Sequence, residues 1–148
     1  MNVTSTTLVR RSLLTAAFAW AAAAPLTAMA DTASFSATLS GAAEVPANAS
    51  TASGALEATL DKSSNVLTWK MTYTGLTGPA TMAHFHGPAM PGANAGVAVP
   101  FPSAASPVES KATLTAAQVA DLMAGKWYAN VHTAANPGGE IRGQLMVK

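Results

Sequence analysis

The chain has three histidines, all in two short motifs, and it has no cysteine. His84 and His86 lie in the run Ala-His-Phe-His-Gly-Pro, and His132 lies in the run Tyr-Ala-Asn-Val-His-Thr. Residues i and i+2 of a strand face the same side, about 6.5–7 Å apart, so the first two imidazoles can turn towards one ion. If a neighbouring strand brings His132 to them, the three nitrogens form a site with an open position, which suits copper or zinc.

Other side chains near these motifs are candidate ligands or supporting groups. Met82 shares the strand face of His84, and its thioether would favour copper(I). Glu44, Asn130 and Glu140 are candidate ligands, or acceptors that fix the tautomer of an imidazole. In the alternative interpretation the histidines are structural, because hydrogen bonds to backbone carbonyls, to Asn130 or to a carboxylate would serve to hold a loop in place.

Arg142 is predicted to have a structural role. It shares a strand face with Glu140, and a bidentate ion pair with Glu44 or Glu140 would pin the last strand to the first. The sequence contains few motifs that would indicate catalysis. It has no Gly-x-Ser-x-Gly elbow, and its acidic residues are too scattered for a paired-carboxylate glycosidase. We therefore predict no catalytic residues, with copper-dependent redox chemistry as the enzymatic alternative.

Alternation of apolar and polar residues predicts the strands that position these side chains. The clearest run covers residues 67–74, where Leu67, Trp69 and Met71 alternate with Thr and Lys. Short strands separated by Gly, Pro and Asn clusters favour an all-β antiparallel sandwich or barrel over a βαβ fold. The expected strands cover 34–40, 55–60, 67–74, 81–86, 97–101, 108–114, 127–133 and 140–147.

One short helix is predicted near 115–124. Thr115 and Gln118 stand at the N-cap and N3 positions of a capping box, in which each side chain satisfies a free backbone N–H of the other. Apolar residues follow at helical spacing, and Gly125 ends the helix. We expect this helix to cover one end of the core.

The N-terminus is typical of an export signal. Arg10 and Arg11 precede an apolar run at 13–24, and Ala-Met-Ala at 28–30 is a cleavage pattern. We therefore predict a signal peptide at 1–30 and one domain at 31–148, periplasmic or secreted, with no membrane segment after cleavage. The arginine pair also loosely resembles a twin-arginine signal, so the export route stays open.

Charge makes nucleic acid an unsuitable partner. The full chain has 8 Lys and Arg against 7 Asp and Glu, but two of the arginines lie in the predicted signal. The remainder has 6 basic and 7 acidic residues, a formal charge of −1, so no basic patch is left to bind phosphates.

Four motifs together resemble the CHRD domain, which is named after its repeats in chordin and also occurs as single copies in exported bacterial proteins. The histidines, Glu44, Asn130, Glu140 and Arg142 all stand at positions that match the family pattern. The resemblance covers essentially the whole of 31–148 and implies an immunoglobulin-like or superoxide-dismutase-like Greek-key β-sandwich. The motifs are FSATLSGAAEVP at 35–46, AHFHGPA at 83–89, YANVHT at 128–133 and PGGEIRGQL at 137–145.

The resemblance implies no established activity. The cysteine-rich modules that bind growth factors in chordin are absent here, so that function does not carry over. Superoxide dismutase of the copper–zinc type needs four histidines around copper alone, which three cannot supply. We expect an exported, non-catalytic CHRD-domain protein with a copper or zinc site, used in metal handling outside the cytoplasm. The alternative is a surface or extracellular protein-interaction module whose histidines are structural.

Overall fold

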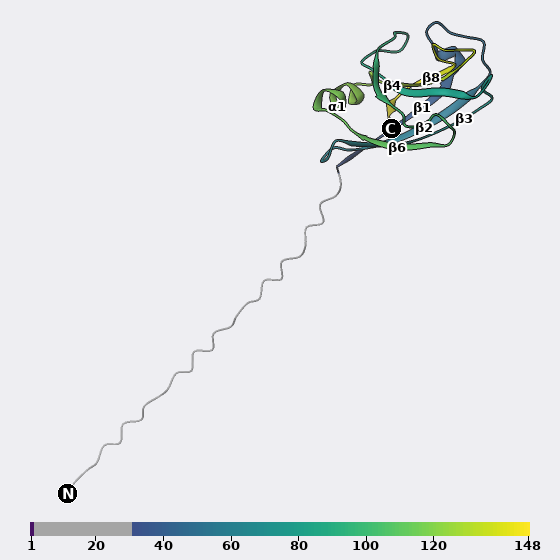
Figure 1. Ribbon diagram of the computed structural model, residues 1–148. Coiled ribbons are helices and arrows are strands. Elements are labelled where there is room, and N and C mark those ends of the chain that lie inside the picture. The colour runs from purple at the N-terminus through teal and green to yellow at the C-terminus, as the bar shows by residue number, and fades with distance from the viewer. Residues whose placement is uncertain (2–30) are drawn as a thin grey trace.

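The fold is known from a computed structural model, which describes Met1 and residues 31–148. The predicted signal peptide lies outside the described residues. The described part is a curved β-structure with one short helix at its side (Figure 1). Its elements are β1 (Thr32–Ser40), η1 (Gly41–Ala43), β2 (Ser53–Asp61), β3 (Val66–Thr74), β4 (Ala80–His86), β5 (Val97–Pro100), β6 (Val108–Thr113), α1 (Ala116–Met123), β7 (Tyr128–Thr133), β8 (Ile141–Gln144) and β9 (Met146–Val147).

The strands form one antiparallel sheet that is nearly closed into a barrel. Hydrogen bonding follows the order β5-β4-β7-β8-β1-β2-β3-β6, and β9 pairs with β1. The predicted antiparallel all-β architecture with one helix is confirmed. The two-sheet sandwich implied by the resemblance is replaced by a continuous sheet, because each strand finds its next hydrogen-bonding partner along the same path and the twist curls the sheet round.

The last predicted strand, 140–147, is divided in two. β8 lies between β7 and β1 and pairs with both, whereas β9 pairs with β1 through Phe35 and Val147. Between them, the backbone N–H of Leu145 donates to the carbonyl of Trp127 at 2.9 Å, and the Leu145 side chain is fully buried. The pairing with β1 is interrupted before this residue, which an alternating apolar pattern does not signal.

Aromatic packing fixes which face of β4 points outwards. Phe85 is fully buried, with its ring centroid 5.0 Å from Trp69, 4.7 Å from Phe101 and 5.7 Å from Trp127. Because side chains alternate across a strand, the residues on either side of Phe85 must point away from this core. His84 and His86 are therefore placed together on the opposite face.

The capping box predicted for the helix is confirmed. The Thr115 hydroxyl accepts from the Gln118 backbone N–H at 3.2 Å, and the Gln118 side-chain oxygen accepts from the Thr115 backbone N–H at 2.9 Å. Leu122 is fully buried, so α1 packs one side against the core as expected. In the part of the chain that the structure describes, there is no helix with the length and apolar character needed to span a membrane.

Candidate metal centre

Strands β4 and β7 lie side by side, and their register brings the histidines together. Met82 lies opposite His132, and His84 lies opposite Asn130. Residues opposite one another in an antiparallel pair face the same side, so His132 becomes the diagonal neighbour of His84. The neighbouring strand that brings His132 to the other two histidines is therefore β7, which pairs directly with β4.

One ring nitrogen from each of the three histidines lies within 4.8 Å of the others. The shortest approach, between Nδ1 of His84 and Nε2 of His132, is 3.2 Å. Two nitrogens that each bind an ion at about 2.0–2.1 Å lie roughly 3.3 Å apart at the tetrahedral angle. The His84–His132 pair already has this spacing. The cluster can hold a metal ion once the third nitrogen, from His86, closes in.

Backbone carbonyls set the orientation of two of the rings. Nδ1 of His86 donates to the carbonyl of Ala95 at 2.9 Å, and Nδ1 of His132 donates to the carbonyl of Pro137 at 2.9 Å. A carbonyl only accepts, so in each neutral ring the proton is on Nδ1 and the lone pair is on Nε2. Both Nε2 atoms are therefore available as metal ligands.

Nε2 of His86 is the most unusual atom of the cluster. It is buried, and no hydrogen-bond partner for it exists among the described residues. Leaving a buried polar atom unpaired costs about 1–3 kcal/mol. By contrast, Nε2 of His132 has two neighbours, since the Asn130 side-chain oxygen lies 3.0 Å away in addition to His84. Asn130 thus lies against the cluster.

The environment of His84 and His86 favours their uncharged form. Burial lowers the pKa of His84 below its ordinary 6.5, and the neighbouring rings of His132 and His86 lower it further. Burial also lowers the pKa of His86, against the raising effects of the hydrogen bond to Ala95 and of the Asn130 side chain. The neutral imidazole is the form that binds metals.

Arg142 has other partners than the predicted ones. Its guanidinium donates to the Asn94 side-chain oxygen at 2.9 Å and to the Ala93 carbonyl at 2.7 Å. Its carbon atom Cζ lies 3.4 Å from the centre of the Tyr128 ring. Within residues 31–148 the ion pairs shorter than 4 Å all involve lysine, so the predicted pair with Glu44 or Glu140 is wrong.

A stack of three planar groups results, consisting of the Arg142 guanidinium, the Tyr128 ring and the His86 ring. The His86 and Tyr128 rings have centroids 4.9 Å apart and planes inclined by 3°. The Tyr128 hydroxyl also accepts from the backbone N–H of Ala95 at 3.2 Å. The stack fixes the plane of the His86 ring, and sequence analysis missed it.

The long loop 87–96 is pinned to this stack. His86, Tyr128 and Arg142 all bind its backbone or its Asn94 side chain. In addition, the Asn94 amide nitrogen donates to the Val45 carbonyl at 2.9 Å. The loop therefore forms a wall of the cluster, and it supplies the carbonyl that orients His86.

Glu140 is fully engaged away from the histidines. It accepts four hydrogen bonds of 2.7–2.8 Å, from the hydroxyls of Ser50, Thr77 and Thr133 and from the Thr77 backbone N–H. Burial by itself raises the pKa of this carboxyl, but the hydrogen bonds outweigh it and lower the pKa to about 2. The prediction that Glu140 ligates the metal or orients a histidine is wrong, because these donors occupy both of its oxygens.

Glu44 is buried beside the turn at 138–139. Its Oε1 atom has no hydrogen-bond partner in the described part of the chain, and burial raises the pKa of the carboxyl despite the opposing charge of Arg142. Gly139 has φ +131°, and a Cβ there would overlap the Glu44 carboxyl and crowd the Asn130 amide. The group of candidate ligands contains the three histidines without Glu44, so its predicted ligand role is not supported.

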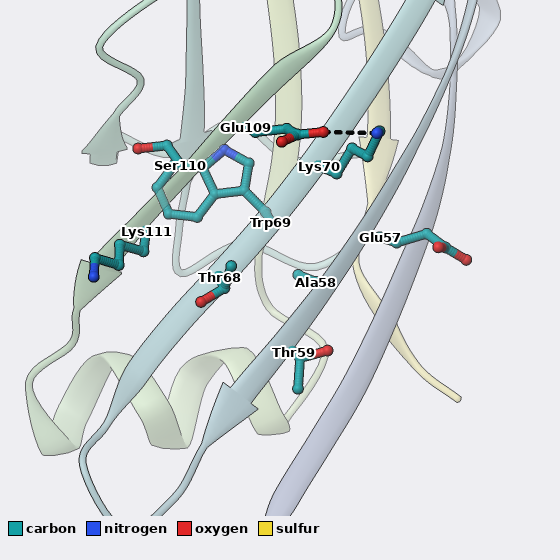
Figure 2. Close-up of a pocket in the computed structure, with 9 residues that line it drawn as sticks. All are labelled: Glu57, Ala58, Thr59, Thr68, Trp69, Lys70, Glu109, Ser110 and Lys111. Carbon is teal, nitrogen blue, oxygen red and sulfur yellow. Dashed lines mark ion pairs between the residues drawn. The ribbon is translucent and has the colours of Figure 1, made fainter.

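Away from the histidines, a groove of about 640 Å³ lies on the outer face of β2, β3 and β6 (Figure 2). Lys70 and Glu109 pair across it at 2.6 Å. Trp69 is only 3% exposed, so its ring is not a platform for a ligand. The charged side chains Lys70 and Glu109 of this groove pair with each other and do not converge on a common ligand position.

Comparison with known proteins gives one match. The family model described as the CHRD domain matches residues 35–145, a span that includes every residue of the cluster. No curated protein and no solved structure matches the chain.

Proposed function

This chain belongs to the CHRD domain family, and we propose that it binds one copper or zinc ion through His84, His86 and His132. The observation that carries the proposal is the buried Nε2 of His86, which has no partner among the described residues and lies beside two other imidazole nitrogens. An ion at the centre would give this lone pair a partner and remove the cost of leaving it unpaired.

The surroundings of the cluster support the proposal. A metal-binding histidine typically makes a hydrogen bond with its other ring nitrogen, which fixes the tautomer and the orientation of the ring. Here the carbonyls of Ala95 and Pro137 fix two tautomers, and Tyr128 fixes the plane of His86. The rings are therefore held with their free lone pairs on Nε2 before any ion arrives.

The rest of the proposal depends on the sequence. The N-terminal pattern at 1–30 favours export, so the site would work in the periplasm or outside the cell. We propose buffering or delivery of the metal rather than catalysis, because no nucleophile and general base are suggested by the sequence motifs.

The alternative is a protein-interaction module with structural histidines. It is favoured by one observation, the contact between Nδ1 of His84 and Nε2 of His132, which satisfies both atoms without an ion when one of them carries a proton. Under this alternative the charged groove on β2, β3 and β6 is the surface that a partner would cover. The unpaired Nε2 of His86 is then left without an explanation.

Calorimetric titration of metal-stripped, tag-free protein with copper(I), copper(II) and zinc distinguishes the two functions. We expect one equivalent to bind the original protein with micromolar or better affinity. The double variant His84→Ala/His86→Ala should lose this binding and remain folded. Glu109→Gln, which alters an exposed carboxylate outside the cluster, is the matched control and should bind as the original does. Absence of stoichiometric binding to the original protein would contradict the proposal and favour the alternative.

A further inference from the structure

We propose that the ion is copper(I), and that the thioether of Met82 completes its ligand set; this inference rests on the metal-binding function proposed above. Met82 precedes His84 by two residues on β4, so both side chains leave the same face of the strand. Met82 also lies directly opposite His132 on β7. Residues so paired have Cβ atoms about 4.5–5.5 Å apart. The sulfur therefore starts from a position next to two of the three imidazoles.

Along this face of β4, exposure is greatest at Met82. Met82 is 48% exposed, whereas His84 and His86 are both partly buried and the Nε2 atom of His86 is fully buried. On the adjoining strand, His132 is only 6% exposed. The cluster is thus closed at its His86 end by the pinned loop and open at its Met82 end. An ion entering from solvent meets the thioether first, and the three rotatable bonds of methionine let the sulfur follow it inwards.

The charge of the site favours a monovalent ion. All four proposed donors are neutral, and the two nearest candidate carboxylates do not contribute. Glu140 is saturated by its four hydrogen bonds, and Glu44 is outside the ligand group. The Arg142 guanidinium adds positive charge through its stack with Tyr128 on His86. A divalent ion gains less electrostatic binding energy here than in a site with an anionic ligand. A soft thioether also prefers copper(I) to zinc.

The test measures copper(I) and zinc affinities separately, each by competition with a chromophoric chelator, under anaerobic conditions for copper(I). Met82→Leu keeps the apolar shape and removes the sulfur. We expect its copper(I) affinity to fall by about tenfold or more, the order of effect expected when a metal site loses support. Its zinc affinity should change by less than about twofold, since zinc gains little from a thioether.

Two further variants make the result specific. Met146→Leu is the matched control, because Met146 is similarly exposed (56%) but lies on β9 beside β1. It should leave both affinities unchanged. Met82→His should instead strengthen zinc binding, since it offers a fourth imidazole at the open end.

The outcomes separate this inference from the function on which it rests. Equal copper(I) affinity of the original protein and Met82→Leu, together with loss of binding in His84→Ala/His86→Ala, would overturn the role of Met82 and leave the histidine site standing. Failure of the original protein to bind either ion would overturn both. X-ray absorption at the copper edge should show sulfur scattering in the original protein and none in Met82→Leu, which supports the inference independently of affinity.

Discussion

Replacing His86 with phenylalanine separates a metal-binding histidine from a structural one. Phenylalanine keeps an aromatic ring that can stack on Tyr128, where the two planes now lie 3° from parallel. It removes both ring nitrogens, which are the unpaired buried Nε2 and the Nδ1 that donates to Ala95. The Ala95 carbonyl keeps a donor, because the Tyr128 hydroxyl lies 3.4 Å away.

The two losses have opposite effects on the free energy of unfolding of the metal-free protein. Removing the unpaired Nε2 stabilises the fold by about 1–3 kcal/mol, and losing the Nδ1 hydrogen bond destabilises it by about 0.5–1.5 kcal/mol. The net result for His86→Phe lies between about 0.5 kcal/mol of lost stability and about 2.5 kcal/mol of added stability. A histidine that the fold depends on would give a clear loss of stability.

The assay is urea unfolding in the presence of a chelator, with the midpoint and slope compared between variants. His132→Phe is the comparison variant, because His132 loses two hydrogen-bond partners, namely the Pro137 carbonyl and the His84 ring. We expect it to be destabilised by about 1–3 kcal/mol. A loss of more than about 2 kcal/mol in His86→Phe would refute the reasoning, since it would make His86 a structural residue.

Three further predictions concern the groups that surround the cluster. The pKa of Glu140 is about 2 in the folded protein against an ordinary 4.5, so the stability it contributes is complete above about pH 4.5 and is lost as the pH falls towards 2. Glu140→Gln should lower the unfolding free energy at pH 7 by about 1–3 kcal/mol and flatten its dependence on pH between 5 and 3, as followed by thermal unfolding; an unchanged pH profile would contradict this. Gly139→Ala should lower the free energy of unfolding by about 2 kcal/mol or more, because φ is positive there and the added Cβ would overlap the Glu44 carboxyl. The second substitution Glu44→Ala should restore part of this loss in the same urea assay. Arg142→Lys should leave the fold intact but speed amide exchange in loop 87–96 by about tenfold, since lysine cannot both stack on Tyr128 and donate twice to the loop; unchanged exchange at Ala95 would count against this role.

Local patterns predicted the faces of the strands and the helix cap. The i, i+2 spacing of His84 and His86 is a property of any strand, and the Thr115–Gln118 box is closed within one turn of helix. Both depend on neighbours in the sequence. The direct pairing of β4 with β7 does not follow from such local patterns, because strand partners are chosen by the packing of the whole sheet.

The partners of the charged side chains could not be predicted in the same way. Arg142 and Glu140 do share a stretch of chain, but loops far away in the sequence bring Asn94 to the first, and Ser50 and Thr77 to the second. Any side chain with a suitable oxygen would serve, so residue type alone did not single these out. The carbonyls that orient His86 and His132 belong to Ala95 and Pro137, whose side chains give no hint of the role.

The most direct test of the metal centre is a ¹H–¹⁵N correlation spectrum of the imidazole nitrogens, recorded while zinc or copper(I), both diamagnetic, is added to tag-free protein. One equivalent of metal should shift the ¹⁵N signals of His86 Nε2, His132 Nε2 and His84 Nδ1. The Nδ1 protons of His86 and His132 should stay in place, since Ala95 and Pro137 hold them. Imidazole signals that do not respond at one equivalent, or that shift only in proportion to excess metal, would contradict metal binding by the three histidines.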